Sequence, residues 1–257
     1  MDLFINTPGT YLHVREAMFE VRKKVEGQVE RHQFAAQKVS RILMSRGAAL
    51  STDAIELAMK YHVDILFVKS DGFPHSRIWH AKLGSTTKIR KLQLKASLGQ
   101  EGLEAIQTWL GKKLENQQAF LVDLGKHRKT LQDDLKEAAE KIASLQFKIT
   151  ASQADSCDGL SDTLRGWEGT AGRLYFQMLG KAIPARYTFH GRSSRPAKDP
   201  FNAFLNYAYG MLYGLVEKSL IIAGIDPYVG YLHRDDYNHK SMVWSVYLFV
   251  DSQLTHK

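Results

Sequence analysis

Two residue types that bind divalent metals stand on either side of one predicted long helix. Glu168 supplies a carboxylate in Glu168-Gly-x-x-Gly-Arg-x-Tyr175, and His233 supplies an imidazole at the end of Gly230-Tyr-Leu-His233. Carboxylate oxygen suits hard divalent cations, and imidazole nitrogen is the other common protein ligand when no thiolates are present. The pair therefore predicts two ligands of a metal site that needs a third.

The helix between them has clear start and stop signals. Asp199 is a strong N-cap residue and Pro200 suits the first helical position, while Gly224 and then Asp226-Pro227 mark the end. We expect this helix to separate the carboxylate from the imidazole along the chain and to frame the site in space.

A basic loop, Arg192–Lys198, leads directly into the N-terminus of this helix. Its three cations are Arg192, Arg195 and Lys198. Helix N-termini favour anions through free amides and the macrodipole, so the loop predicts a phosphate cradle, with a solvated basic loop as the alternative. One face of the helix carries four polar or aromatic residues, which predict either a groove wall or buried tyrosines with satisfied hydroxyls: Asn202, Asn206, Tyr209 and Tyr213.

The surroundings of Glu168 include two glycines on the same predicted helix. Gly169 and Gly172 are three residues apart, and each costs about 1 kcal/mol relative to alanine in a helix. That cost is usually tolerated where a neighbouring backbone comes close. We expect Glu168 to point into a tight space between helices; the alternative is a surface glutamate beside a glycine packing site.

Composition narrows the class of protein. The chain has 257 residues, 44% hydrophobic and 24% charged, which is typical of a globular protein and not of disorder. The net charge of +8 indicates a polyanionic partner, with nucleic acid as the first candidate. No apolar run is long enough to cross a bilayer and the start lacks a signal peptide, so we expect a cytoplasmic protein.

The single cysteine, Cys157, excludes an internal disulfide and a thiolate metal cluster. It lies in the polar stretch from Asp155 to Asp158 with no neighbouring histidine, so we do not expect it to be a nucleophile. A metal in this protein would have to be held by oxygen and nitrogen.

Residues 1–84 predict a small β-rich module. Strands are expected at 11–14, 17–21, 39–44, 63–68 and 73–79, the last two joined by a hairpin turn at 70–72. Ser51, Thr52 and Asp53 offer N-caps for a short helix that should run to about Tyr61, with Glu56, three residues after Asp53, as the return partner of a capping box.

Residues 85–257 predict an all-α part, so the fold class is α+β. Two apolar stripes at helical spacing should form its core: Leu103, Ile106, Leu110 and Leu114 in one, and Leu131, Leu135, Ala138, Ile142 and Leu145 in the other. At the junction, Lys88–Lys95 carries four cations in eight residues and is either a solvated helix face or part of a phosphate-binding surface.

These motifs together resemble the family of CRISPR-associated adaptation integrases. The matching segments are Glu168–Tyr175, Phe189–Arg192, Asp199–Tyr209, Ala223–His233, and Asp235-Asp236 followed by Ser241. The resemblance implies a β-rich dimerisation domain at 1–84 and a helical metal-dependent nuclease domain at 85–257. It also implies a homodimer that acts with a second, small ferredoxin-like adaptation protein.

By this resemblance the protein inserts new spacers into a CRISPR array, as part of antiviral defence, through phosphodiester cleavage and transesterification. Glu168 and His233 match the first two ligands of Mg²⁺ or Mn²⁺. Double-stranded or branched DNA would be bound by Arg173, Arg192, Arg195, Lys198 and Asn206, and Tyr209 would position the nucleophile or stack on a base.

The chain departs from the family pattern at the third ligand, where an aspartate is replaced by Ser245. A neutral hydroxyl cannot replace the charge of a carboxylate at a hard cation. Asp235, Asp236 and Asp251 are candidate substitutes. The pattern then fades before Lys257, which suggests a truncation or frameshift, and we expect Trp244, Tyr247, Leu248 and Phe249 to form an exposed apolar patch.

Two functions from different classes therefore remain open. The first is an active metal-dependent DNA endonuclease and integrase. The second is a catalytically degenerate homologue that keeps the fold and acts at most as a DNA-binding or assembly subunit. A basic helical scaffold that binds no nucleic acid is a third alternative, which the charge of the loop disfavours.

Overall fold

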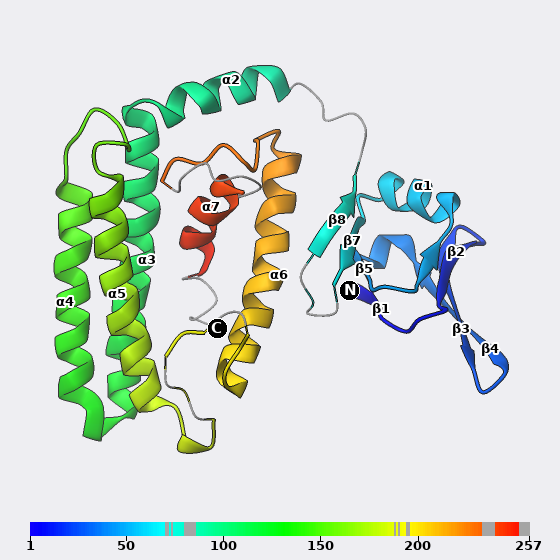
Figure 1. Cartoon of the computed structure of the whole chain (residues 1–257), viewed down its shortest axis with the longest axis horizontal. Coiled ribbons are helices and arrows are strands. Elements are labelled where there is room, and N and C mark those ends of the chain that lie inside the picture. The colour runs from blue at the N-terminus through cyan, green and yellow to red at the C-terminus, as the bar shows by residue number, and fades with distance from the viewer. Residues whose placement is uncertain are drawn as a thin grey trace. The chain divides into compact units, whose positions relative to one another are not determined.

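The computed structural model describes residues 1–69, 72, 74–79, 86–187, 189, 191–193, 196–232 and 240–251. The chain divides into two compact units, Met1–Leu83 and Gly84–Lys257. The first unit contains two four-stranded sheets and a short helix, and the second is helical (Figure 1). The predicted α+β class is confirmed.

One sheet of the first unit is mostly parallel. Its order is β1 (Asp2–Ile5), β5 (Arg41–Met44), β7 (Asp64–Val68) and β8 (Pro74–Ile78), and only β8 runs antiparallel to its neighbour. All four residues of β5 are buried, as expected for a central parallel strand that is covered on both faces. The antiparallel pairing of β7 with β8 confirms the predicted hairpin, whose turn residues Ser70 and Asp71 lie outside the described part.

The other sheet has the order β4 (Gln28–Ala35), β3 (Met18–Val25), β2 (Tyr11–Arg15) and β6 (Ala49–Leu50). Leu12 and Phe19 are fully buried in the core of the unit. The sequence did not predict β4, which is exposed along most of its length and therefore has little apolar alternation. Placing Ala17 in a strand was also wrong, because Glu16 and Ala17 both have positive φ and form the turn between β2 and β3.

Helix α1 (Thr52–Lys60) packs into the core of the first unit through Ala54 and Ala58, and it starts at the first of the three predicted N-cap candidates. Its N-cap is Ser51, whose hydroxyl oxygen accepts a hydrogen bond from the amide of Ala54 at 3.2 Å. The capping box predicted for Asp53 and Glu56 is therefore wrong. Asp53 already lies in the first turn, where its charge is favourable beside the positive end of the helix dipole.

The second unit is built from six helices in its described part. They are α2 (Thr86–Ser97), α3 (Gln100–His127), α4 (Gln132–Ala151), α5 (Ser161–Ala182), α6 (Pro200–Ile222) and α7 (Ser241–Asp251). Figure 1 shows α3, α4 and α5 side by side, and α7 contacts both α3 and α6. Short 3₁₀ turns lie at Ala36–Lys38, Lys129–Leu131 and Ala185–Tyr187.

The predicted apolar stripes form the core of this unit. Leu103, Ile106, Leu110 and Leu114 are at most 2% exposed, and they pack with Leu135, Ala138 and Ile142 of α4, while Leu131 and Leu145 are partly buried. Cys157 joins the same cluster, and burial raises the pKa of its thiol to about 11, so it is almost entirely protonated at neutral pH.

Two further sequence expectations concern the apolar segments. None of the described helices is both long enough and apolar enough to cross a membrane. Trp244 is 39% exposed and its ring lies 5.7 Å from that of Tyr213, so it is partly covered. The side chains of Tyr247, Leu248 and Phe249 lie outside the described part.

Candidate metal and DNA site

Glu168 lies on α5 and faces α3. Its Oε1 accepts a hydrogen bond from Nζ of Lys113 at 2.6 Å. The side chain of Glu168 is 21% exposed and that of Lys113 is 10% exposed. The predicted ligand is therefore a partly exposed carboxylate that already has one buried cationic partner.

Helices α3 and α5 run parallel at this point. Lys113 pairs with Glu168, and seven residues later the ring of Phe120 lies 6.0 Å from that of Tyr175. The turn of α3 between these two contacts carries Asn116 and Gln117, which are each 7% exposed. Asn116 Nδ2 and Gln117 Oε1 are buried without a hydrogen-bond partner among the described residues. A buried polar wall thus continues along α3 from Lys113.

The glycines beside Glu168 do not mark a close contact between helices. A Cβ atom placed on Gly169 or Gly172 would meet nothing within 4 Å among the described residues. The expected close packing at these positions is therefore not found within the described part of the chain. Glu168 itself does face a neighbouring helix, through its contact with Lys113.

The segment that precedes His233 is fixed on the two helices that carry Lys113 and Glu168. The ring of Tyr231 stacks on Trp109 of α3 at 6.0 Å, and burial raises the pKa of its hydroxyl. Arg165 of α5 donates a hydrogen bond from Nη1 to the carbonyl oxygen of Leu232 at 2.8 Å. Trp109 and Arg165 each lie one turn before Lys113 and Glu168 on their helices.

His233, Asp235 and Asp236 lie outside the described residues, as does the side chain of Asp251. The structure therefore leaves these four as predictions. What it does fix is the position of the residue just before His233, since Leu232 is 3% exposed and belongs to the core cluster of the bundle.

Two further contacts hold the same segment from other sides. Gln93 of α2 donates hydrogen bonds from Nε2 to the carbonyl oxygens of Asp226 and Val229 at 2.8 and 2.9 Å. Gly230 lies against the start of α7, because a Cβ atom at this position would be 2.4 Å from the Cβ of Ser241. Glycine at 230 is therefore required for this close approach.

Ser245 occupies the position where the family pattern has its third ligand, and it points into the protein. It is fully buried, and its hydroxyl donates to the carbonyl oxygen of Ser241 at 2.9 Å within α7. Among the described residues, no three His, Cys, Asp or Glu side chains form a metal-binding group. Glu168 thus fits a divalent cation as a partly exposed carboxylate, whereas Ser245 does not fit one.

The predicted start of α6 is confirmed. The side chain of Asp199 accepts a hydrogen bond from the amide of Asn202 at 2.7 Å, and Pro200 is the first helical residue. Asn202 is fully buried, and its amide group ties the basic loop to the helix. It donates to the carbonyl oxygen of Gly191 at 2.8 Å and accepts from the amide of Ser193 at 2.9 Å.

Arg192 is held at the surface by contacts from α6. Its guanidinium lies 5.1 Å from the ring centre of Tyr209, and Nη1 donates to Oδ1 of Asn202 at 3.2 Å. Asn206 donates a long hydrogen bond of 3.4 Å to the carbonyl oxygen of Ser193. The polar face of α6 therefore positions the basic loop, which is a role that neither of the two sequence alternatives described.

The remaining predicted cations lie around this loop. Lys198 is exposed, and its backbone amide donates to Oγ of Ser193 at 3.0 Å. Arg173 is exposed on α5, and Arg195 lies outside the described residues.

A pocket of about 560 Å³ lies between α5 and the basic loop. It is lined by Gly172, Arg173, Phe176, Gln177, Gly180, Lys181, Phe189, Gly191 and Arg192. The rings of Phe176 and Phe189 lie 6.2 Å apart within this lining, and two arginines flank them. An aromatic surface with cations at its rim suits a nucleotide, because a base can stack on a ring while its phosphate meets a guanidinium. Gly172 lies one turn after Glu168 on the same side of α5.

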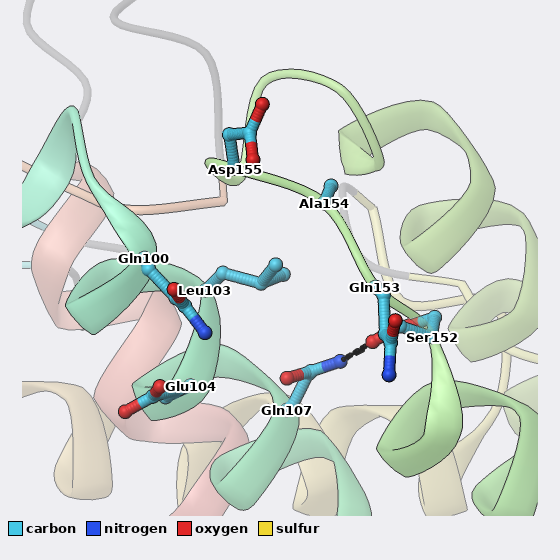
Figure 2. Close-up of a pocket in the computed structure, with 8 residues that line it drawn as sticks. All are labelled: Gln100, Leu103, Glu104, Gln107, Ser152, Gln153, Ala154 and Asp155. Carbon is cyan, nitrogen blue, oxygen red and sulfur yellow. Dashed lines mark hydrogen bonds between the residues drawn. The ribbon is translucent and has the colours of Figure 1, made fainter.

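A second pocket of about 520 Å³ has a different chemistry (Figure 2). It is lined by Gln100, Leu103, Glu104, Gln107, Ser152, Gln153, Ala154 and Asp155. Gln107 donates from Nε2 to the carbonyl oxygen of Ser152 at 2.7 Å, so it caps the C-terminal end of α4. With two carboxylates and no cation in its lining, this pocket does not suit a phosphate.

Lys113 is the residue at this site that the sequence analysis missed. A signal was present, because Lys113 directly precedes the buried Leu114 and lies three residues after the buried Leu110. A lysine at the edge of an apolar stripe is either exposed or paired in the interior. Only its partner, 55 residues away, decides between the two.

The relationships of the chain to known proteins agree with this geometry. The family model described as CRISPR associated protein Cas1 matches residues 3–245. The CRISPR-associated endonuclease Cas1 1 of Archaeoglobus fulgidus is 32% identical over 245 residues, covering 91% of this chain and 70% of that protein.

Two solved structures share the fold. A casposase bound to integration product has a TM-score of 0.77 at 18% identity, with 99% of this chain and 70% of that chain covered. A Cas6-RT-Cas1–Cas2 complex has a TM-score of 0.74 at 21% identity, with 99% and 27% covered. The chain therefore belongs to the Cas1 family of CRISPR-associated proteins.

Proposed function

We propose that this protein is a divalent-metal-dependent DNA endonuclease and integrase that inserts new spacers into a CRISPR array. The observation that carries the proposal is the fixed position of Tyr231 and Leu232. They are bound to α3 and α5 one turn before Lys113 and Glu168, which supports a site shared by Glu168 and the residue that follows Leu232 in sequence.

In this proposal, Glu168 and His233 would hold Mg²⁺ or Mn²⁺ together with a carboxylate from Asp235, Asp236 or Asp251. The ion would polarise the scissile phosphate and lower the pKa of the attacking water or 3′-hydroxyl. The third carboxylate is a requirement of the proposal, since Ser245 is buried and donates its proton within α7.

The remaining residues of the site would bind the DNA. Arg173, Arg192 and Lys198 are exposed cations that would contact backbone phosphates, with Arg195 beside them in sequence. The contact of Arg192 with the ring of Tyr209 fixes the direction of the guanidinium, so it would meet a phosphate with little loss of side-chain freedom. The lining of the pocket by Phe176 and Phe189 would exclude water from a base placed there.

The test is cleavage of branched DNA by the purified protein in Mn²⁺, followed on denaturing gels. We expect products that vanish in Glu168→Ala and persist in the matched control Glu115→Ala, whose carboxylate is an exposed partner of Lys112 on α3. Cleavage that survives Glu168→Ala would overturn the proposal, because it would place the active carboxylate elsewhere.

A catalytically inactive DNA-binding subunit is the second candidate function. The observation in its favour is the buried, internally bonded Ser245 at the third ligand position. Retention of DNA without cleavage at any metal concentration would support this candidate over the first. Failure to retain DNA even at low salt would remove both, since phosphate contacts strengthen as salt falls.

We further propose that the protein acts as a homodimer together with the small ferredoxin-like adaptation protein. The long strand β4 forms an edge of its sheet and is exposed over Gln28–Gln33, which leaves backbone groups free to pair with another chain. The structural relative that contains both Cas1 and Cas2 supports the second partner. Sedimentation of the protein alone and with that partner tests both contacts.

A further inference from the structure

We propose that Lys113 is a displaceable counter-ion of Glu168, so that its ammonium group and a divalent cation compete for one carboxylate. The inference rests on the proposed function, because it takes Glu168 as a metal ligand. It adds that the metal affinity of the protein is set partly by a residue on α3 that is itself no ligand.

The burial of Lys113 needs an explanation. The whole residue is 8% exposed, and lysine is rarely so buried unless it is paired. A buried ion pair contributes little to stability compared with apolar side chains of similar volume, and the flanking buried positions Leu110 and Leu114 carry leucine, while Asn116 and Gln117 are buried one turn further on. Packing alone therefore does not account for a lysine at this position.

The geometry of the pair leaves room for a second cation. Lys113 Nζ lies 2.6 Å from Oε1 of Glu168, and among the described residues no other group bonds to this carboxylate. The side chain of Glu168 is 21% exposed among the described residues, so part of the carboxylate is accessible to an ion from solvent. A divalent cation bound there would repel the ammonium group at close range in a poorly solvated space. Binding of the metal should therefore drive the ammonium away from Glu168.

An alternative acceptor for the ammonium lies one turn along α3. Gln117 is four residues after Lys113, so the two side chains are neighbours on one face of the helix. Its Oε1 is buried and has no hydrogen-bond partner in the described part of the chain. Lys113 can thus exchange a charged partner for a neutral one without leaving the bundle. The adjacent Lys112 differs from Lys113, because its partner is the exposed Glu115, at 3.0 Å.

The experiment is a Mn²⁺ titration of the full chain in the absence of DNA, followed by the loss of the electron paramagnetic resonance signal of free Mn²⁺. Lys113→Gln keeps a hydrogen-bond donor near Glu168 but removes the charge, so we expect Mn²⁺ to bind about tenfold more tightly. Lys113→Arg keeps the charge and should bind as the wild type does. Lys112→Gln makes the same change in net charge and should also leave the affinity unchanged.

A second variant tests the same idea from the acceptor side. Gln117→Met removes the acceptor for the displaced ammonium, so Mn²⁺ should bind about threefold more weakly, with Gln118→Met as the control. Thermal melts followed by circular dichroism show whether Lys113→Gln folds. If it does not fold, Gln117→Met tests whether Lys113 competes with the metal for Glu168. A residue that only supports the fold would not raise metal affinity when it is replaced.

The outcomes separate this inference from the proposed function. Mn²⁺ binding that Glu168→Gln removes, but that Lys113→Gln and Gln117→Met leave unchanged, overturns the counter-ion role and leaves the metal site intact. If the wild-type protein has no Mn²⁺ binding that depends on Glu168, both the counter-ion role and the metal-dependent function are overturned.

Discussion

Two carboxylates of this protein, Glu20 and Glu168, are paired with cations in different ways. In the first unit, Glu20 is buried with its side chain 1% exposed and accepts hydrogen bonds from Arg22 and Gln33, with His13 Nε2 also at 2.8 Å. The hydrogen bond from Arg22 is the largest cause that lowers its pKa to about 2, against the opposing effect of burial. In the second unit, Glu168 is bonded only by Lys113 in the part of the chain that the structure describes, and its side chain is 21% exposed.

The difference separates a structural carboxylate from an available one. The oxygens of Glu20 are saturated by donors on three neighbouring strands, so no site for a metal remains on it. Among the described residues, Glu168 bonds only to Lys113, which lies on a different helix, and its side chain is 21% exposed. Both the number of donors around the carboxylate and its burial therefore distinguish Glu168 from Glu20.

The largest expected effect on stability is at Glu20. In Glu20→Gln, Arg22 loses the charge of its buried partner, so we expect the melting temperature of the first unit to fall by roughly 5 to 10 °C. Scanning calorimetry measures the change, and hydrogen exchange of β2 and β3 assigns it to this unit. The control is Glu30→Gln on β4, where the glutamate is 50% exposed and should tolerate the change. Equal melting temperatures for the two variants would show that Glu20 stabilises the fold no more than the exposed Glu30 does.

The pair at Glu168 should behave differently in a double-mutant cycle. Lys113→Met and Glu168→Leu each leave one charge unpaired and should cost about 2 kcal/mol in the free energy of unfolding. The double variant should return to within about 1 kcal/mol of the wild type, because an apolar pair of similar volume replaces the ions. Chemical denaturation measures all four proteins. A double variant as unstable as the sum of the singles would show that the two side chains do not couple, which would contradict the pairing of Lys113 with Glu168.

Ser245→Asp sharpens the comparison by adding a second available carboxylate. We expect Mn²⁺ to bind about tenfold more tightly, since hard cations gain from each added anionic oxygen. The metal-free variant should melt at a lower temperature, because Ser245 is fully buried. Ser219→Asp is the control, as Ser219 donates to the carbonyl oxygen four residues before it in the same way but is exposed. Unchanged Mn²⁺ affinity in Ser245→Asp would remove this position from the metal site.

The smallest expected effect is a dependence of stability on pH. The pKa of Glu20 falls from 4.5 in its ordinary state to about 2 in the folded protein. Its ionised form therefore stabilises the fold above pH 4.5, and this contribution is lost as the pH falls from 4.5 towards 2. Melting temperatures over this range should fall more steeply for the wild type than for Glu20→Gln. Parallel curves for the two proteins would contradict the pairing of Glu20.

Features set by neighbouring residues could be predicted from the sequence. Asp199 and Pro200 start α6 because a cap and a fixed φ act within one turn, and the leucine spacing of α3 predicts its buried face. The order and spacing of the motifs around Glu168 identified the family. Local signals predicted the first residue of a helix less reliably where several possible N-cap residues lie close together. Ser51 and Asp53 are an example, since each is compatible with a helix start.

Other features depend on the tertiary structure alone. Lys113 meets Glu168 only because α3 and α5 run parallel in one register, and Glu20 gathers its donors only because β2, β3 and β4 align. The lack of close packing at Gly169 and Gly172 in the described part of the chain was likewise decided by which helices pack there. The sequence predicted the helical bundle, most of the strands and Glu168 as a candidate metal ligand. Packing determined which charges meet, because electrostatic contacts depend on distances in space that residue spacing along the chain does not contain.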